Sequence, residues 1–287
     1  MKLTDTYKKI TMIHLGQFNT LTLLRITPPG AYLGDDEDNV VLLPTKYIPE
    51  NIEIGDAINV FVYLDSEDRI ISTTKKPYLE LHGFAALKVN QVSHFGAFLD
   101  WGIEKDLLVP FKEQKQKMEE GKRYIVHLYL DDATQRLVAS SKIRKYLEFE
   151  HILVQENEEV DLLIADSTEL GRNVIVNETY SGLIFKSDIS RIVKFGERCK
   201  GYVKSIRPDG KLDITLDKIG FVKMESNCER LLEILKEKNG IIYLTDKSDP
   251  DNIREEVGMS KKTFKNAIGM LYKQRLITLA NNHIKLV

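Results

Sequence analysis

The sequence has few of the residues that cross-link a small extracellular domain or hold a structural metal. Its 287 residues include two cysteines, Cys199 and Cys228, which lie far apart and form no CxxC pair. A disulfide framework and a cysteine-rich zinc site are therefore excluded, and a reducing compartment is expected.

Long apolar runs are also missing. No segment approaches the roughly 18 consecutive apolar residues that a membrane-spanning helix needs. The first residues, MKLTDTYKKITMIHLGQF, lack the uninterrupted apolar core of a signal peptide. We therefore expect a cytoplasmic protein without membrane contact.

The chain lacks an excess of positive charge. It carries 41 Lys and Arg residues against 43 Asp and Glu residues, for a formal charge of -2. A protein that coats nucleic acid by charge alone needs many phosphate contacts from Lys and Arg. Any binding to a polyanion must then be local.

Sequence motifs of common enzymes are absent too. There is no P-loop, GxGxxG or GxSxG, and the six histidines show neither HExxH nor paired metal-ligand spacing. Acidic runs such as ENEEVD are more typical of a solvated surface than of a metal site. We expect a protein that is not an enzyme and uses no cofactor or metal.

What the sequence does contain is a repeat. The segment GAYL, beginning at Gly30, aligns with GAFL, beginning at Gly96, at a shift of 66 residues. Without a gap, the same shift places VLLP on LLVP, Gly55 on Gly121 and Asp65 on Asp131. In a more divergent third copy, Gly171, Phe185 and Gly196 have the same spacing as Gly96, Pro110 and Gly121 in the second. The repeat units are residues 9–76, 77–147 and 148–219.

Each repeat contains short segments rich in β-branched and aromatic residues, separated by Gly, Asp and Asn. Examples are INVFVYLDSEDRIIST, RYIVHLYLDDATQRLVASS and KGYVKSIRPDGKLDITL, which predict the fourth and fifth strands of each unit. Five strands in about 70 residues favour an OB-fold barrel over a sandwich, which needs more strands per core.

Residues 221–287 have a different pattern. Leucines in ESNCERLLEILKEKNG share one helical face, Pro250 opens a second helix, and Ser260 is the expected N-cap of a third. The hairpin LITLANNHIKLV follows, with Asn281 and Asn282 as its turn. The predicted fold is multidomain: three five-stranded antiparallel OB-fold β-barrels followed by a small α+β winged helix-turn-helix domain, with the four modules in line and loosely packed.

The middle repeat resembles the RNA-binding OB repeat of the ribosomal S1 type. The segments that carry the resemblance are GFAALKVNQVSHFGAFLDWGIEKDLLVP and EEGKRYIVHLYLDDATQRLVASSK. Three such repeats with the C-terminal module resemble the bacterial conserved virulence factor B family over nearly the whole chain. That resemblance implies RNA binding and gene regulation, including regulation of virulence genes.

The resemblance also implies which side chains meet RNA. It places Phe95 and Phe98 at base-stacking positions, with His94, Lys88 and Arg136 near phosphate or base edges, and Asp131 matches the family pattern. The segment VNQVSHFGAFLDWG predicts two strands hinged on Gly96, and strand alternation predicts an outward Phe98, opposite Ala97 and Leu99. The alternative is that the rings fill the small barrel.

The other repeats depart from the family pattern. Pro44, Pro110 and Phe185 replace its histidine, so a polar base contact is lost in each repeat. The first repeat keeps one ring, Tyr32, and carries the acidic run DDED at residues 35–38. The third has no ring at the two stacking positions, but a basic stripe in residues 186–211 includes the candidates Lys200, Lys204 and Arg207. A solvated surface is the alternative for this stripe. The second repeat is therefore the best RNA candidate.

The third predicted helix is basic. Its apolar stripe of Phe264, Ile268 and Leu271 leaves the candidate contacts Lys261, Lys262, Lys265 and Lys273 facing outward. The expected partner is single-stranded or structured RNA, with single strands preferred, and DNA is an alternative for the winged helix. Contact with ribosome or RNA polymerase is a further expectation. The competing interpretation is a protein-interaction adaptor that docks on ribosome, RNA polymerase or a nuclease.

Overall fold

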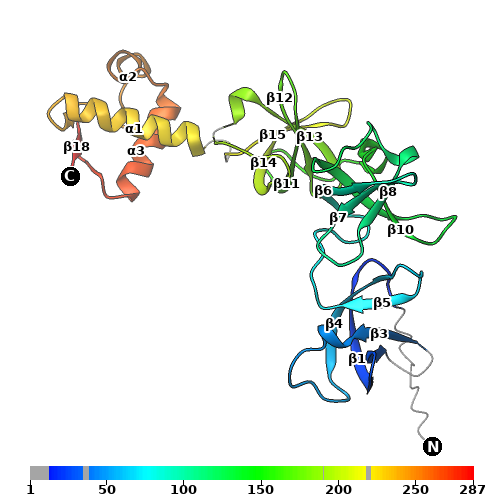
Figure 1. Ribbon diagram of the computed structural model, residues 1–287. Helices are drawn as coiled ribbons and strands as arrows, with labels where there is room; N and C mark the ends of the chain where they lie inside the picture. Colours follow the sequence, from blue (N-terminus) through cyan, green and yellow to red (C-terminus); the bar gives the residue numbers. More distant parts are fainter. Residues whose placement is uncertain (1–12, 35–38, 190, 218–220) are drawn as a thin grey trace, which may run out of the picture.

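The computed structural model describes residues 13–34, 39–189, 191–217 and 221–287, with the backbone alone for residues 221–226. Three β-barrels follow one another along the chain, and a helical domain lies beyond the third (Figure 1). The acidic run at residues 35–38 lies outside the described residues. No helix in the described ranges is long and apolar enough to cross a membrane.

The first barrel is a closed sheet of five strands. These are β1 (Phe18–Thr27), β2 (Gly30–Gly34), β3 (Val40–Pro44), β4 (Ala57–Leu64) and β5 (Ile70–Thr73). Their order around the barrel is β1-β2-β3-β5-β4, and all pairs are antiparallel except β3 with β5. A 3-10 helix, Thr45–Tyr47, follows the third strand.

The third repeat closes like the first. The second arranges its five strands in the equivalent order as a nearly closed sheet, because its third and fifth strands lie in contact without a hydrogen-bonded pair among the described residues. The second has β6 (Phe84–Val92), β7 (Gly96–Asp100), β8 (Leu107–Pro110), β9 (Arg123–Leu130) and β10 (Leu137–Ser140). The third has β11 (Glu159–Ser167), β12 (Gly171–Val176), β13 (Tyr180–Phe185), β14 (Arg198–Ile206) and β15 (Leu212–Thr215). Short 3-10 helices cover Phe111–Glu113, Ile143–Tyr146 and Lys186–Asp188. The predicted fold class is confirmed.

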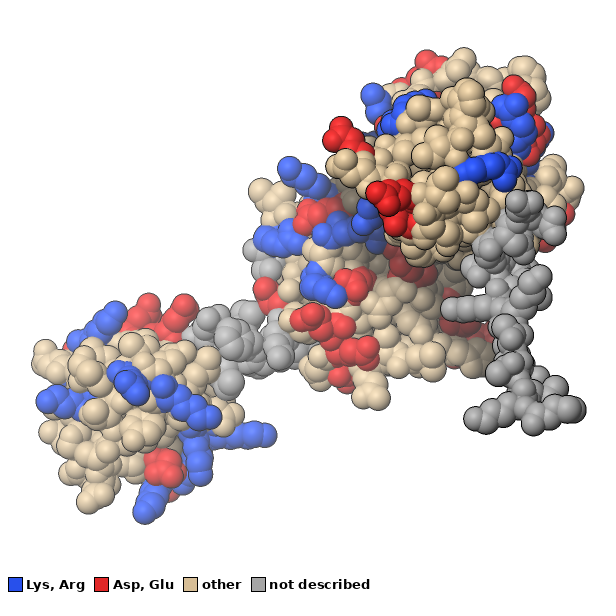
Figure 2. All heavy atoms as spheres, turned by 90° about the horizontal axis from the view of Figure 1, so that it is seen from below, with Lys and Arg blue, Asp and Glu red and all other residues tan. Residues whose placement is uncertain are grey.

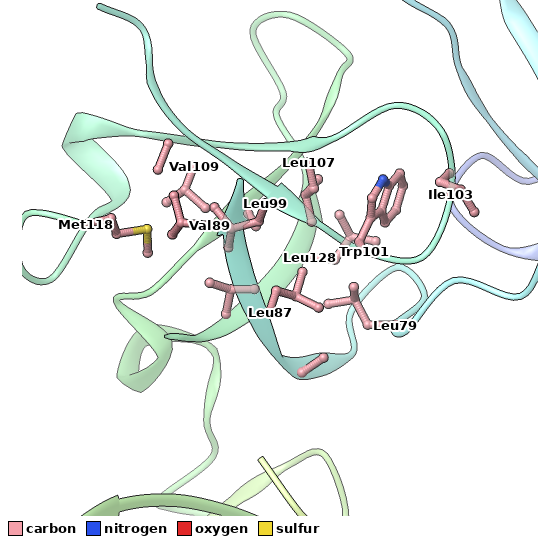
Figure 3. Close-up of a cluster of buried hydrophobic side chains, with 14 of the residues drawn as sticks. Leu79, Leu87, Val89, Leu99, Trp101, Ile103, Leu107, Val109, Met118 and Leu128 are labelled. Atoms are coloured by element: carbon pink, nitrogen blue, oxygen red, sulfur yellow. The ribbon is translucent and has the colours of Figure 1, made fainter. Parts of the chain in front are cut away.

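Strand alternation fills the core of the second barrel. Ala97 and Leu99 of β7 are buried, while Phe98 between them faces out of the barrel. Figure 3 shows the cluster, with Met118 at one end and Trp101 and Ile103 at the other. The predicted outward direction of Phe98 agrees with this burial pattern.

Gly96 is required by a close approach of strands rather than by a hinge. A Cβ atom at Gly96 would lie 2.2 Å from the carbonyl oxygen of Val109 on β8. The turn itself is Ser93–Phe95, closed by the Ser93 N–H donating to the Gly96 carbonyl at 2.9 Å. The expected hinge on Gly96 is therefore corrected: this glycine begins β7, and it has no side chain because the neighbouring strand occupies that space.

The first two barrels share part of one hydrophobic cluster. Phe61 and Tyr63 of β4 pack with the core of the second barrel, and the Phe61 ring meets Trp101 edge to face with centroids 5.7 Å apart. Between the second and third barrels, Phe84 and Ile125 form a smaller cluster with Leu163 and others. The expectation of loosely packed modules is wrong for the three barrels, because apolar side chains are buried at both junctions.

The C-terminal domain has three helices and a small sheet. Its elements are α1 (Phe221–Glu237), β16 (Ile241–Ile242), α2 (Pro250–Val257), α3 (Lys261–Lys273), β17 (Ile277–Leu279) and β18 (Ile284–Leu286). The Ser260 hydroxyl caps α3 by accepting from the Thr263 N–H, and Pro250 lies in the first turn of α2, as predicted. The sheet order β16-β18-β17 adds one strand to the predicted two-stranded hairpin.

Candidate nucleic-acid interface

The two phenylalanines of the second barrel lie outside its core. Phe95, in the turn before β7, is 61% exposed, and Phe98 is half-buried. The His94 ring lies beside Phe95, with ring centroids 3.9 Å apart. Because neither phenylalanine belongs to a core cluster of the described residues, both rings can present a face to a ligand.

A cavity of about 480 Å³ lies against these rings. The second barrel contributes Phe95, Phe98 and Leu108 to its walls, and the first barrel contributes Tyr63 and Asp68. The site therefore lies at a junction between two barrels, which the repeat pattern of the sequence does not predict. Only the exposed acidic turn DSEDR, between β4 and β5, hints at it in the sequence.

Charged groups of both barrels are paired at the rim of this cavity. The Arg136 guanidinium donates to the carboxylate of Asp68, and the Lys105 ammonium donates to the Asp65 carbonyl at 2.6 Å. Burial lowers the pKa of Lys105 below its ordinary value. Because Arg136 and Lys105 already have partners, a ligand at this rim meets aromatic rings and polar groups rather than free positive charge.

Asp131 supports the neighbouring turn. Its carboxylate accepts from the Thr134 hydroxyl at 2.7 Å and from the Thr134 N–H at 3.2 Å. The hydroxyl hydrogen bond holds the pKa of Asp131 below its usual range. Its backbone N–H donates to the Arg136 carbonyl, so Asp131 shapes the loop that carries Arg136.

The structure brings together some predicted residues and not others. Phe95, Phe98 and Arg136 line the same cavity, and the His94 ring lies tilted against Phe95. Lys88 is exposed on β6, where it lies opposite Arg123 on β9 and does not line this cavity. Contact of these side chains with RNA stays a prediction.

The first and third barrels each place an arginine over one ring. The Arg25 guanidinium lies 4.3 Å from the centroid of Tyr32, which is half-buried. In the third barrel, Arg207 lies 5.4 Å from the centroid of Phe185. These rings are covered on one face by their own cation, so they offer less open aromatic surface than Phe95.

The basic stripe of the third barrel is largely ion-paired. Lys200 contacts Asp161 at 2.7 Å, Lys204 contacts Asp188 at 2.8 Å, and Arg207 contacts Asp213 at 2.5 Å. Asp161 and Asp213 lie outside residues 186–211, and the pairing of neighbouring strands brings them close to the cations. The stripe therefore carries less free charge than its sequence indicates, and nucleic-acid binding there stays a prediction.

Helix α3 presents the expected basic face. Phe264, Ile268 and Leu271 are buried, whereas Lys262, Lys265 and Lys273 are exposed and Lys261 is half-buried. No ion pair involves these four lysines within the described part of the chain. Figure 2 shows several Lys and Arg side chains on this domain. The helix can therefore meet a polyanion without first breaking a salt bridge.

Comparison with known protein families identifies two kinds of domain in the chain. Residues 15–75 and 84–142, the first two barrels, match the S1 domain family. Residues 229–286 match the family described as CvfB-like winged helix domain. These are nucleic-acid-binding rather than enzyme families, so the chain carries nucleic-acid-binding domains.

Individual relatives cover most of the chain. It is 28% identical over 271 residues to the uncharacterized protein YitL of Bacillus subtilis, covering 90% of this chain and 89% of that protein. It is 25% identical over 262 residues to conserved virulence factor B of Staphylococcus epidermidis, covering 88% of each. A solved multidomain protein with nucleic acid binding domains from Streptococcus pneumoniae is 21% identical, with a TM-score of 0.40, over 95% of this chain and 98% of that one.

Proposed function

The chain belongs to the conserved virulence factor B family, and on that premise we propose that it is an RNA-binding regulator of the cytoplasm. Its second barrel is the principal RNA site, and binding influences gene expression, including that of virulence genes. No reaction is catalysed. The observation that carries the proposal is the pair of outward rings, Phe95 and Phe98, beside a cavity between two barrels.

Stacking is the main source of affinity in this proposal. A base stacked on an aromatic side chain contributes about 1–3 kcal/mol, so two rings supply substantial binding in a chain without net positive charge. Single strands are preferred because their bases are free to leave a stack, whereas duplex bases are paired inside the helix. The ion pairs at the rim limit the contribution of phosphate contacts at this site.

Helix α3 supplies a second contact on the same RNA. Once the second barrel has bound RNA, the tethered helix experiences an effective concentration of that RNA of about a millimolar. The exposed Lys262 and Lys265 then add phosphate contacts that a short ligand does not reach. DNA is the alternative ligand for this helix.

A protein-interaction adaptor is the second candidate function. The third barrel exposes large apolar side chains, namely Leu153, Leu170 and Ile192. Such residues favour docking on a protein surface, with ribosome, RNA polymerase or a nuclease as the partner.

The proposal is tested by fluorescence anisotropy with labelled oligouridine and, separately, duplex DNA at several salt concentrations. Phe98→Ala is expected to weaken RNA binding by about tenfold or more, because one stacking contact is lost. Tyr243→Ala removes an exposed ring on another module and serves as the matched control. Lys261→Glu with Lys265→Glu is expected to weaken binding and flatten its salt dependence, with Lys236→Glu and Lys247→Glu as the charge-matched control.

The result decides between the two candidates. RNA affinity that is unchanged by Phe98→Ala and by the α3 double change contradicts the RNA proposal and favours the adaptor. A wild-type protein that binds no RNA at low salt leads to the same conclusion.

A further inference from the structure

A second cavity, of about 680 Å³, lies at the junction of the second and third barrels. We call it the junction groove. Its cationic lining is Lys115, Lys117, Lys122 and Arg123, all from the second barrel. Phe195 and Asp166 of the third barrel form part of the facing wall.

The two walls of the junction groove are fixed relative to each other. Phe84 and Ile125 pack against Leu163 in a buried cluster that spans the two barrels. The Arg198 guanidinium donates to the Phe84 carbonyl and to the carboxylate of Glu178, which also accepts from the Phe84 N–H at 2.7 Å. A ligand therefore meets a groove whose shape is set before binding.

The acids of the loop that carries the groove cations already have partners, and two of them are engaged outside the groove. Glu113 is buried and pairs with Lys145 at 2.7 Å, while Glu120 accepts from the Val92 N–H at 2.9 Å. Glu119 neutralises one groove cation, Lys122, at 2.8 Å. Because these three carboxylates already have partners, they do not neutralise the remaining cations of the groove.

Three groove cations remain available. Lys115, Lys117 and Arg123 are exposed, and within the described ranges none of them forms an ion pair. The third-barrel wall contributes one acid, Asp166. The groove lining thus holds four cations against two acids in a chain that is otherwise slightly acidic. This local excess is what a phosphate-binding surface requires.

The junction groove lies at the opposite end of β9 from the aromatic cavity. Arg123 begins this strand, and Arg136, which follows the strand's far end, lines the aromatic cavity. Eight strand residues span about 25 Å. A ligand of a few nucleotides on the rings does not reach the groove, but a longer strand does.

We infer that the junction groove holds the phosphate backbone of the same RNA strand whose bases stack on Phe95 and Phe98. This inference rests on the proposed RNA-binding function. Lys115, Lys117 and Arg123 contact phosphate oxygens, and the Phe195 ring forms an apolar wall beside the sugar. Such contacts position the strand without reading its sequence. The groove therefore contributes affinity and salt dependence, but no base preference.

The test compares oligouridines of about 5 and about 20 nucleotides, since one OB fold covers about 4–16. Lys115→Glu with Lys117→Glu is expected to weaken binding of the long RNA about tenfold and to leave the short RNA unchanged. The slope of log affinity against log salt falls by about 1.4, at about 0.7 per lost phosphate contact. Lys236→Glu with Lys247→Glu carries the same change of charge on the helical domain and is expected to leave the long-RNA slope closer to wild type.

The milder pair Lys115→Gln with Lys117→Gln guards against a loss caused by misfolding, and thermal unfolding checks all variants. If the Lys115→Glu, Lys117→Glu variant binds the long RNA with wild-type affinity and salt slope while Phe98→Ala still weakens RNA binding, the inference about the groove is wrong and the RNA proposal stands. Equal weakening of the short and long RNA also overturns it. If the wild type binds neither RNA, the proposed function itself fails.

Discussion

At the residue scale, His127 is a buried titratable group of the second barrel whose surroundings disfavour its charged form. It is 4% exposed on β9, between Phe84 and Tyr146, with ring centroids 4.5 and 3.9 Å away. Its Nδ1 atom has no hydrogen-bond partner among the described residues. Burial, with smaller contributions from nearby His82 and Lys145, lowers the pKa of His127 to about 4.

The lowered pKa of His127 predicts a loss of stability in mild acid. The unfolded chain takes up this proton near about pH 6.5, whereas the folded chain resists until about pH 4, so protonation favours unfolding in between. This stability is fully present well above pH 6.5 and falls by about 3 kcal/mol as the pH drops to 4. Urea unfolding at about pH 7.5, 6 and 5, at constant ionic strength, measures this change in the free energy of unfolding.

His127→Phe is the matched variant for this measurement, since it keeps a ring in an aromatic site and removes the titration. Its stability is expected to change less between pH 7.5 and about 5 than that of the wild type. Identical pH profiles for the two proteins contradict the assignment.

Residue-scale predictions from the sequence succeed where local geometry decides. The alternation of Ala97, Phe98 and Leu99 predicts which ring faces outward, because neighbouring residues on a strand point to opposite faces. The partner of Arg136 could not be predicted in this way. Asp68 belongs to another repeat, and no local rule connects the two positions.

At the element scale, the turn between β4 and β5 belongs to two barrels at once. The Asp65 carboxylate accepts from the Glu67 N–H and the Arg69 N–H, which fixes the turn within the first barrel. The same turn contacts the second barrel through Asp68 and the Asp65 carbonyl. In the proposed RNA complex, a ligand phosphate at the aromatic cavity therefore competes with Asp68 for Arg136.

Asp68→Asn is expected to raise RNA affinity about threefold, because it frees the Arg136 guanidinium and removes a negative charge from the rim. The slope of log affinity against log salt steepens by up to about 0.7 for one added phosphate contact. Anisotropy titration with oligouridine measures both. Glu50→Gln, at an exposed site of the same barrel, is the control. Weaker binding by Asp68→Asn would show instead that Asp68 orients Arg136 for the ligand.

Elements of the helical domain differ in how well the sequence predicts them. The starts of α2 and α3 are predicted because Pro250 and Ser260 act through local backbone geometry. Strand β16 is missed because it has two residues, Ile241 and Ile242, and exists through pairing with β18. A segment this short carries no periodicity of its own.

At the scale of the whole molecule, the first two barrels are expected to unfold together. Phe61 is fully buried; it packs with Phe18 and Tyr63 of its own barrel and with Trp101 across the junction. Phe61→Ala is predicted to destabilise both barrels by about 3–5 kcal/mol. Hydrogen exchange measured by mass spectrometry should show faster exchange in β1–β10 and unchanged exchange in α1–α3.

Phe264→Ala is the matched control, because Phe264 is the equivalent fully buried ring of the helical domain. It should accelerate exchange in that domain and spare the barrels. Faster exchange confined to the first barrel in Phe61→Ala would contradict a shared unit.

The repeat in the sequence predicts the three barrels and their internal order, because each copy contains the five strands of one closed or nearly closed sheet. It does not predict the junctions, since a periodic pattern describes what the copies share and not where they touch. Both cavities lie at those junctions. Counting cations along the chain also overstated the charge of the third barrel, where acids such as Asp161 lie on a neighbouring strand.

The close strand approach at Gly96 occurs in all three barrels. A Cβ atom would lie 2.2 Å from the Leu43 oxygen at Gly30 and 1.9 Å from the Ile184 oxygen at Gly171. The third barrel keeps this glycine although it lacks both stacking rings and lies outside the matched S1 segments. The shape of the barrel and the chemistry of its outer face are therefore set by different positions: the approach of two strands leaves no room for a side chain at one point of each copy, while the outward residues differ from copy to copy.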